Sequence, residues 1–186
     1  MPLIVGGGAA VLVALIALVW FTASRRPTQP PPVAPGLGVA TTDITQMSPR
    51  EQANRLFDRV MAAQERGDQQ EVDFFAPMAI QTHALLGALD NDARYHLGLL
   101  HTVGGSREAA LVQADSLELA VPGHLFAAML RATVALAGGD DAELARTREA
   151  FLEVYDREVA SARPEYSEHA TSIDTFLAEA RSNVTR

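Results

Sequence analysis

The side chains of this 186-residue chain that could bind a metal or transfer protons are its histidines and carboxylates. The five histidines are His83, His96, His101, His124 and His169. His96 and His101 are five positions apart, so they do not share a helix face as a metal-binding pair at i and i+4 would. We therefore interpret each histidine as a groove, turn or surface residue, and we expect no metal site.

The composition excludes several kinds of active site. The chain has no cysteine, which excludes disulfides, a thiolate zinc site and a cysteine nucleophile. All 15 basic residues are arginine, so a lysine Schiff base and a P-loop lysine are excluded as well. Asp90-Asn91-Asp92 lacks the later glycine and glutamate of a calcium loop, and it more simply caps a helix that starts near Ala93. We expect neither an enzyme nor a bound cofactor.

The charge of the chain from residue 48 onward argues against nucleic acid as a partner. This part contains 13 arginines and 22 acidic residues, so its net charge is 13 − 22 = −9. A surface of this sign repels phosphates, and it favours basic partner surfaces instead.

An uncharged apolar segment near the N-terminus predicts a transmembrane helix. Residues 3–22 contain 16 apolar residues out of 20, and such a helix spans about 30 Å, the thickness of the hydrocarbon layer. Trp20 suits the interface, and Arg25 and Arg26 end the anchor, which we assign to residues 1–26. The alternative is a cleaved signal peptide, which would need a basic start and a shorter apolar run.

The arginines after the apolar segment also predict its orientation. Because basic residues favour the cytoplasmic side, we expect a single-pass protein of the bacterial inner membrane with its larger C-terminal part in the cytoplasm, the periplasm being the alternative. Small residues recur at helical spacing in the segment and could pack against another membrane helix, although such residues are common in these helices. They are Gly6, Ala10, Ala14 and Ala17.

Residues 27–47 have the composition of a linker. Five prolines fall between Pro27 and Pro35, and proline lacks the N–H group that helices and sheets use. We expect a polyproline II spacer that holds the following domain away from the bilayer or lies along a partner.

Residues 48–186 predict an all-α domain. Ser48-Pro49-Arg50-Glu51 is typical of a capped helix start. Gly67-Asp68 and Gly139-Asp140 each place a turn glycine before an aspartate cap, and Gly105-Ser106 is a weaker version of the same turn. The turn glycines are 38 and 34 residues apart, which indicates a helical repeat.

The middle repeat, residues 91–124, has the clearest pattern. Small side chains at Gly98 and Ala110 are expected where its two antiparallel helices cross, and Pro122 is expected to end the second helix. With Leu97, these residues resemble the tetratricopeptide repeat family, although His101 stands where that family usually has tyrosine. An unrelated helical bundle with similar turns is the alternative.

The flanking units resemble the family less closely. Residues 125–158 match it at few positions, and residues 53–90 contain Pro77, which predicts a kink or break near Phe75-Ala76. A further helix over residues 165–183 is amphipathic, and we expect it to cap the apolar end of the repeat array. The domain is thus predicted as a helical-hairpin solenoid with a C-terminal capping helix.

The resemblance implies that the first helix of each pair lines a concave groove. The corresponding residues are Asn54, Phe57, Met61, Gln64, Asp92, Tyr95, Leu99, Thr102, Phe126, Met129, Thr133 and Leu136. This mostly apolar lining, with adaptable methionines, would suit a basic or amphipathic segment of another protein. The alternative is that the C-terminal helix or the kinked second helix fills the groove.

These features together predict an interaction protein. We expect a membrane-anchored scaffold or accessory subunit in a bacterial membrane complex for biogenesis, translocation or energy transduction. Its partners would be other subunits, contacted through the membrane helix and the helical domain. The alternative is a transient peptide-binding adaptor or assembly chaperone that uses the groove.

Overall fold

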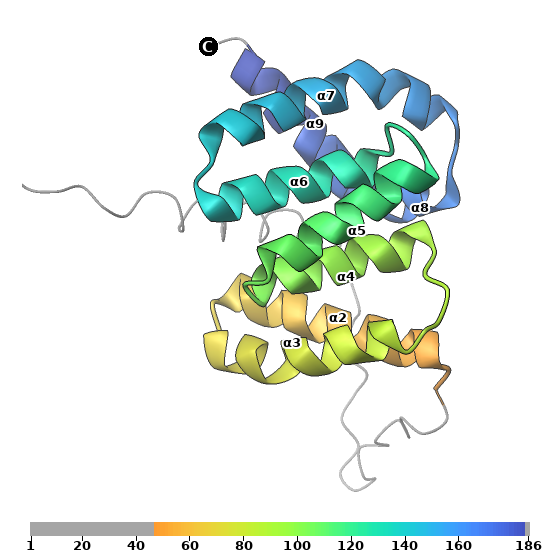
Figure 1. The fold of residues 1–186 in the computed structure, drawn as a ribbon, viewed down its shortest axis with the longest axis vertical. Helices are drawn as coiled ribbons and strands as arrows, with labels where there is room; N and C mark the ends of the chain where they lie inside the picture. The colour runs from red at the N-terminus through yellow and green to blue at the C-terminus, as the bar shows by residue number, and fades with distance from the viewer. Residues whose placement is uncertain (1–46, 185–186) are drawn as a thin grey trace, which may run out of the picture.

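The computed structural model describes residues 47–184, which form eight α-helices and no strand (Figure 1). The helices are α2 (Pro49–Arg66), α3 (Gln69–Ala84), α4 (Asn91–Val103), α5 (Arg107–Ala120), α6 (Leu125–Gly138), α7 (Asp141–Ala160), α8 (Pro164–Glu168) and α9 (Ala170–Val184). The all-α prediction is therefore confirmed for this part of the chain.

The predicted membrane anchor lies outside the described residues. The same holds for its small-residue stripe at Gly6, Ala10, Ala14 and Ala17 and for the linker up to residue 46. Within residues 47–184, no helix combines the length and the apolar character that crossing a bilayer requires.

The helix starts follow the predicted capping pattern. Ser48 and Glu51 form a reciprocal capping box at the start of α2. Asp68, Asp90 and Asp140 each accept a hydrogen bond from the backbone N–H three residues later. Ser106 makes no such bond, in agreement with the weaker signal at that turn.

Three turns with the same hydrogen bonds divide the first six helices into hairpins. At the first turn, the N–H of Gly67 donates to Gln64 and the N–H of Asp68 donates to Ala63, at 3.1 and 2.9 Å. Equivalent bonds close the turns at residues 105–106 and 139–140. Gly67 has a φ of 69°, a left-handed conformation that favours glycine. The helical repeat indicated by the turn spacing is thus present as repeated structure.

The hairpins stack side by side in chain order (Figure 1). Helix α2 packs on α3, α4 on α5 and α6 on α7, and α3–α4 and α5–α6 contacts join the hairpins. The first helices also contact one another in the order α2, α4, α6, so they form one layer. Helix α9 packs against α7 and contributes Ile173 and Leu177 to the main core, as expected of a capping helix.

Gly98 lies at a helix crossing, but the crossing involves a different helix from the one predicted. A Cβ atom added at Gly98 would clash with Cδ2 of the Leu130 side chain on α6. The close approach is therefore between the first helices of successive hairpins. Ala110 is fully buried, and α5 ends at Ala120, just before Val121 and Pro122, as predicted.

The structure corrects two predictions, the break at Pro77 and the single helix over residues 165–183. Helix α3 runs without interruption through Pro77. Proline has no N–H group, so the carbonyl of Asp73 loses its helical hydrogen bond. Both residues are exposed, so water can bond this carbonyl instead. The predicted capping helix is instead two helices, α8 and α9, which meet at His169. The His169 side chain is bonded to Asp92 on α4, and this tertiary contact holds the residue outside the helix.

His124 caps α6 with its imidazole. Its Nδ1 accepts from the N–H of Phe126 at 3.2 Å, so Nε2 carries the proton and donates to Glu165, also at 3.2 Å. The ring is completely buried. Burial lowers the pKa of His124 even though the Glu165 carboxylate acts in the opposite direction.

The contact at Gly98 predicts that Gly98→Ala destabilises the domain by about 1–3 kcal/mol, because the fully buried Leu130 has little room to move. Adding Leu130→Ala should relieve the clash, so the two losses should be less than additive. The control is Gly138→Ala at the end of α6, where a new Cβ meets only the guanidinium of Arg107, at the far end of a long side chain that bonds the Ala137 carbonyl. This change should leave stability unchanged or slightly raised. Urea denaturation followed by circular dichroism measures the wild type, the two single variants at Gly98 and Leu130, their double variant and Gly138→Ala. Equal effects at the two glycines would contradict the packing assignment.

The cap at His124 predicts a pH-dependent contribution to stability. Because its folded pKa lies below the unfolded value of about 6.5, the contribution is complete above that pH and declines as the pH falls toward the folded pKa, by up to about 1.4 kcal/mol per pH unit. In His124→Asn, the amide can still cap the helix but does not titrate. Urea denaturation between pH 7.5 and 5 should show a shallower loss of stability for the variant, whereas parallel curves would refute this assignment.

Candidate functional site

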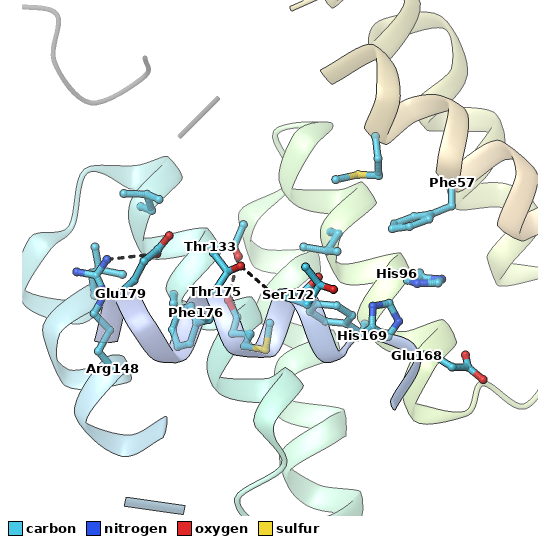
Figure 2. Close-up of a pocket in the computed structure, with 18 of the residues that line it drawn as sticks. Phe57, His96, Thr133, Arg148, Glu168, His169, Ser172, Thr175, Phe176 and Glu179 are labelled. Carbon is cyan, nitrogen blue, oxygen red and sulfur yellow. Dashed lines mark hydrogen bonds and ion pairs between the residues drawn. The ribbon is translucent and has the colours of Figure 1, made fainter. Parts of the chain in front are cut away.

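A cavity of about 340 Å³ lies between the layer of first helices and the C-terminal helices (Figure 2). We call it the concave pocket. Its first wall comes from α2, α4 and α6, and its residues there are Phe57, Asp58, Met61, Tyr95, His96, Leu99, Met129, Ala132, Thr133 and Leu136. The second wall comes from α7 to α9, and its residues are Leu144, Arg148, Glu168, His169, Thr171, Ser172, Thr175, Phe176 and Glu179.

Seven of the twelve predicted groove residues line the concave pocket. They are Phe57, Met61, Tyr95, Leu99, Met129, Thr133 and Leu136. The other five do not line it. Phe126 is fully buried in the core, Thr102 bonds the carbonyl of Gly98, and Asp92 belongs to a polar network described below. Asn54 and Gln64 are half-buried on α2.

The second wall contains the lining residues that the groove prediction missed. The amphipathic pattern of residues 165–183 predicts a capping helix, but it does not say which face of the array the helix covers. In the structure, α9 lies along one side of the groove and leaves the cavity beside it (Figure 2). The C-terminal helix therefore narrows the groove without filling it, and α3 contributes no residue to the lining.

The two ends of the pocket differ in charge. The Asp58 and Glu168 carboxylates are exposed at the pocket, and partial loss of hydration raises the pKa of Asp58. At the other end, Arg148 and Glu179 approach to 3.9 Å (Figure 2). Arg148 is the only arginine among the described lining residues, which contain three carboxylates. The first wall of the pocket is thus mostly apolar, the second wall contributes hydroxyl groups from Thr171, Ser172 and Thr175, and carboxylates outnumber the single arginine.

A polar network borders the pocket where α2, α4 and the α8–α9 junction meet. Asp92 Oδ2 accepts from Arg50 at 2.6 Å, and Asp92 Oδ1 lies 2.7 Å from Nε2 of His169. His96 Nε2 is 3.5 Å from the same Oδ1 atom. His96 and His169 line the pocket, so the network faces its interior (Figure 2).

The surroundings fix the charge states of this network. Burial alone would raise the pKa of Asp92, but the hydrogen bond from His169 and the nearby His96, His169 and Arg50 hold it at about 2. Burial lowers the pKa of His96 to about 3, against the influence of Asp92. At neutral pH the site therefore contains a carboxylate beside a neutral His96 imidazole.

Aromatic contacts fix the rings around the network. His96 stacks on Phe57 with ring centroids 3.9 Å apart, and Tyr95 stacks on Phe126 at 4.3 Å. The His169 ring meets Tyr95 edge-on at 5.4 Å. The imidazoles are thus held by packing as well as by hydrogen bonds.

One donor atom from each of Asp92, His96 and His169 lies within 4.8 Å of the others, which makes them the candidate metal ligands of the described residues. The interpretation of each histidine as a groove, turn or surface residue did not predict that two of them lie beside Asp92. A signal was present, because Asp92 and His96 stand at i and i+4 and share one face of α4. His169 is 77 positions from Asp92, and no local pattern connects them.

Comparison with known proteins gives no family assignment: no protein-family model, curated protein or solved structure matches the chain.

Proposed function

We propose that this chain is a membrane-anchored interaction protein of the tetratricopeptide type that holds a segment of a partner protein in the concave pocket. The observation that carries the proposal is the cavity of about 340 Å³ between the first helices of three stacked hairpins and α9. A pocket that combines apolar side chains with a few polar groups is suited to anchoring side chains of a bound segment.

The geometry of the repeats supports the family resemblance. Three hairpins with the same turn hydrogen bonds stack so that their first helices form one layer, and the pocket lies on that layer. This is the arrangement that the resemblance implies for a ligand groove.

The charges favour a basic, amphipathic partner segment. Asp58 and Glu168 are exposed at one end of the pocket, and the chain from residue 48 onward has a net charge of 13 − 22 = −9. An arginine or lysine of the partner would stabilise the charged form of Asp58, whose pKa is raised in the free domain. Apolar side chains of the same segment would contact the walls at Leu99, Met129 and Leu136.

The predicted membrane helix and linker would place the pocket near the surface of the inner membrane. A domain tethered at the inner membrane meets other membrane subunits at a high effective concentration, so a modest pocket affinity suffices for a stable complex. We therefore propose a role as scaffold or accessory subunit of a membrane complex, with the helical domain on the cytoplasmic side.

A transient adaptor or assembly chaperone is the second candidate. Met61 and Met129 both line the pocket, and methionine side chains repack readily around ligands of different shape. The two candidates differ in lifetime: a subunit co-purifies stoichiometrically in mild detergent, whereas an adaptor does not.

Site-specific photo-cross-linking in native membranes tests pocket binding. A photo-reactive phenylalanine analogue replaces Thr133 or Leu136 on the pocket wall, and in the control it replaces Leu119, which is 87% exposed on α5. We expect a discrete cross-linked partner from the two pocket positions and none from Leu119. Tyr95 and Phe126 are unsuitable positions because they are buried in the core.

Charge reversal makes the same test specific for a basic partner. Asp58→Arg with Glu168→Arg should reduce the cross-linked product at least about tenfold, because like charges across an interface repel. The matched control is Asp156→Arg with Asp174→Arg, which changes the net charge equally at exposed positions outside the pocket lining. The proposal would be refuted if the two double variants gave equal yields of the cross-linked partner. Equal yields of this product from the probes at positions 119 and 136 would refute it as well.

A further inference from the structure

We propose that Asp92, His96 and His169 form a binding site for a divalent transition-metal ion at the end of the concave pocket. The site is independent of the proposed partner binding, since it uses side chains of this chain alone. Two imidazoles and one carboxylate form a ligand set that Zn²⁺ accepts, and three protein ligands with an open position are typical of accessible zinc sites.

The donor atoms of the three side chains already lie close together. Asp92 Oδ1 lies 2.7 Å from His169 Nε2 and 3.5 Å from His96 Nε2, and one donor atom per residue falls within 4.8 Å of the others. Metal–nitrogen and metal–oxygen bonds of about 2.0–2.2 Å separate neighbouring ligands by a little over 3 Å in a tetrahedral site. Small rotations of these side chains would therefore be enough to surround an ion.

The surroundings hold the ligands in place. Arg50 binds Asp92 Oδ2 at 2.6 Å, which leaves Oδ1 as the oxygen that faces the histidines. Such bonds to the second oxygen are common around metal-binding carboxylates. Phe57 stacks on the His96 ring at 3.9 Å and limits its rotation. The ligands are thus preorganised by contacts that a metal ion would not displace.

Nε2 is the nitrogen of His96 that can bind the ion. It lies 3.5 Å from Asp92 Oδ1, whereas Nδ1 of the same ring is buried and has no hydrogen-bond partner among the described residues. With an ion on Nε2, the ring proton would reside on Nδ1.

The pocket supplies both access and the open coordination position. His96 and His169 line the cavity, so an ion held by them would face its interior. A water molecule, or a carboxylate or histidine of a bound segment, would complete the coordination there. The ion would also join α4 to the α8–α9 junction, since its ligands come from both.

Zinc binding to the full-length chain tests the site. The protein is purified in mild detergent without an oligohistidine tag, dialysed against EDTA, and titrated with ZnCl₂ by calorimetry. We expect about one tight equivalent per chain. His169→Gln and His96→Gln should each weaken binding at least about tenfold, because loss of even an outer-shell partner has an effect of this size.

The control is His101→Gln, a half-buried histidine on α4 outside the cluster, which should bind as the wild type does. Co²⁺ gives a second readout: its visible absorption bands should appear in the wild type and in His101→Gln but not in His169→Gln. The chain has no cysteine, so no thiolate band can confuse the spectra. Circular dichroism shows which variants are folded. If His96→Gln is unfolded, the zinc affinity of His169→Gln tests the site, because His169 is partly exposed and its replacement disturbs the core less. Absence of a tight equivalent, or equal affinity in His169→Gln and His101→Gln, would show a hydrogen-bond network only and overturn the proposal.

Discussion

The placement of the C-terminal helices depends on the hydrogen bonds of the Asp92 carboxylate. This carboxylate lies on α4, binds Arg50 of α2 through one oxygen and meets His169 at the α8–α9 junction through the other. Asp92 is only 9% exposed, and a buried charge without partners would cost several kcal/mol. Arg50 and His169 are therefore held close to Asp92. Because α9 begins at the residue after His169, this contact also fixes the start of α9.

A second set of polar contacts supports this placement. The Tyr166 hydroxyl accepts from the N–H of Leu125 on α6 and donates to the buried Glu158 carboxylate of α7, each at 3.1 Å. With α8 fixed in this way, Ile173 and Leu177 of α9 pack into the main core. The stacked hairpins form the first wall of the pocket, and the contacts of Asp92 and Tyr166 determine the position of the second wall. The depth of the pocket thus follows from a few buried polar groups rather than from the repeats alone.

Features that depend on neighbouring residues could be predicted from the sequence. The capping box at Ser48, the aspartate caps and the glycine turns all follow from local hydrogen bonding. Contacts between distant residues could not. The neighbour of Gly98 is Leu130 on the next hairpin, and His169, where α8 and α9 meet, is hydrogen-bonded to the distant Asp92. Seven of the predicted groove residues line the pocket because repeat geometry fixes them, whereas its second wall depends on where α9 packs.

The dependence of α9 on Asp92 can be measured by amide hydrogen exchange in the presence of EDTA. Asp92→Asn is compared with Asp115→Asn, whose carboxylate forms an exposed ion pair with Arg131. We expect exchange in α8 and α9 to become at least about tenfold faster in Asp92→Asn, while the α6–α7 hairpin stays close to wild type. Asp115→Asn should leave all these helices unchanged. Exchange in α9 that is the same in both variants would contradict the central role of the Asp92 carboxylate in positioning the second wall of the pocket.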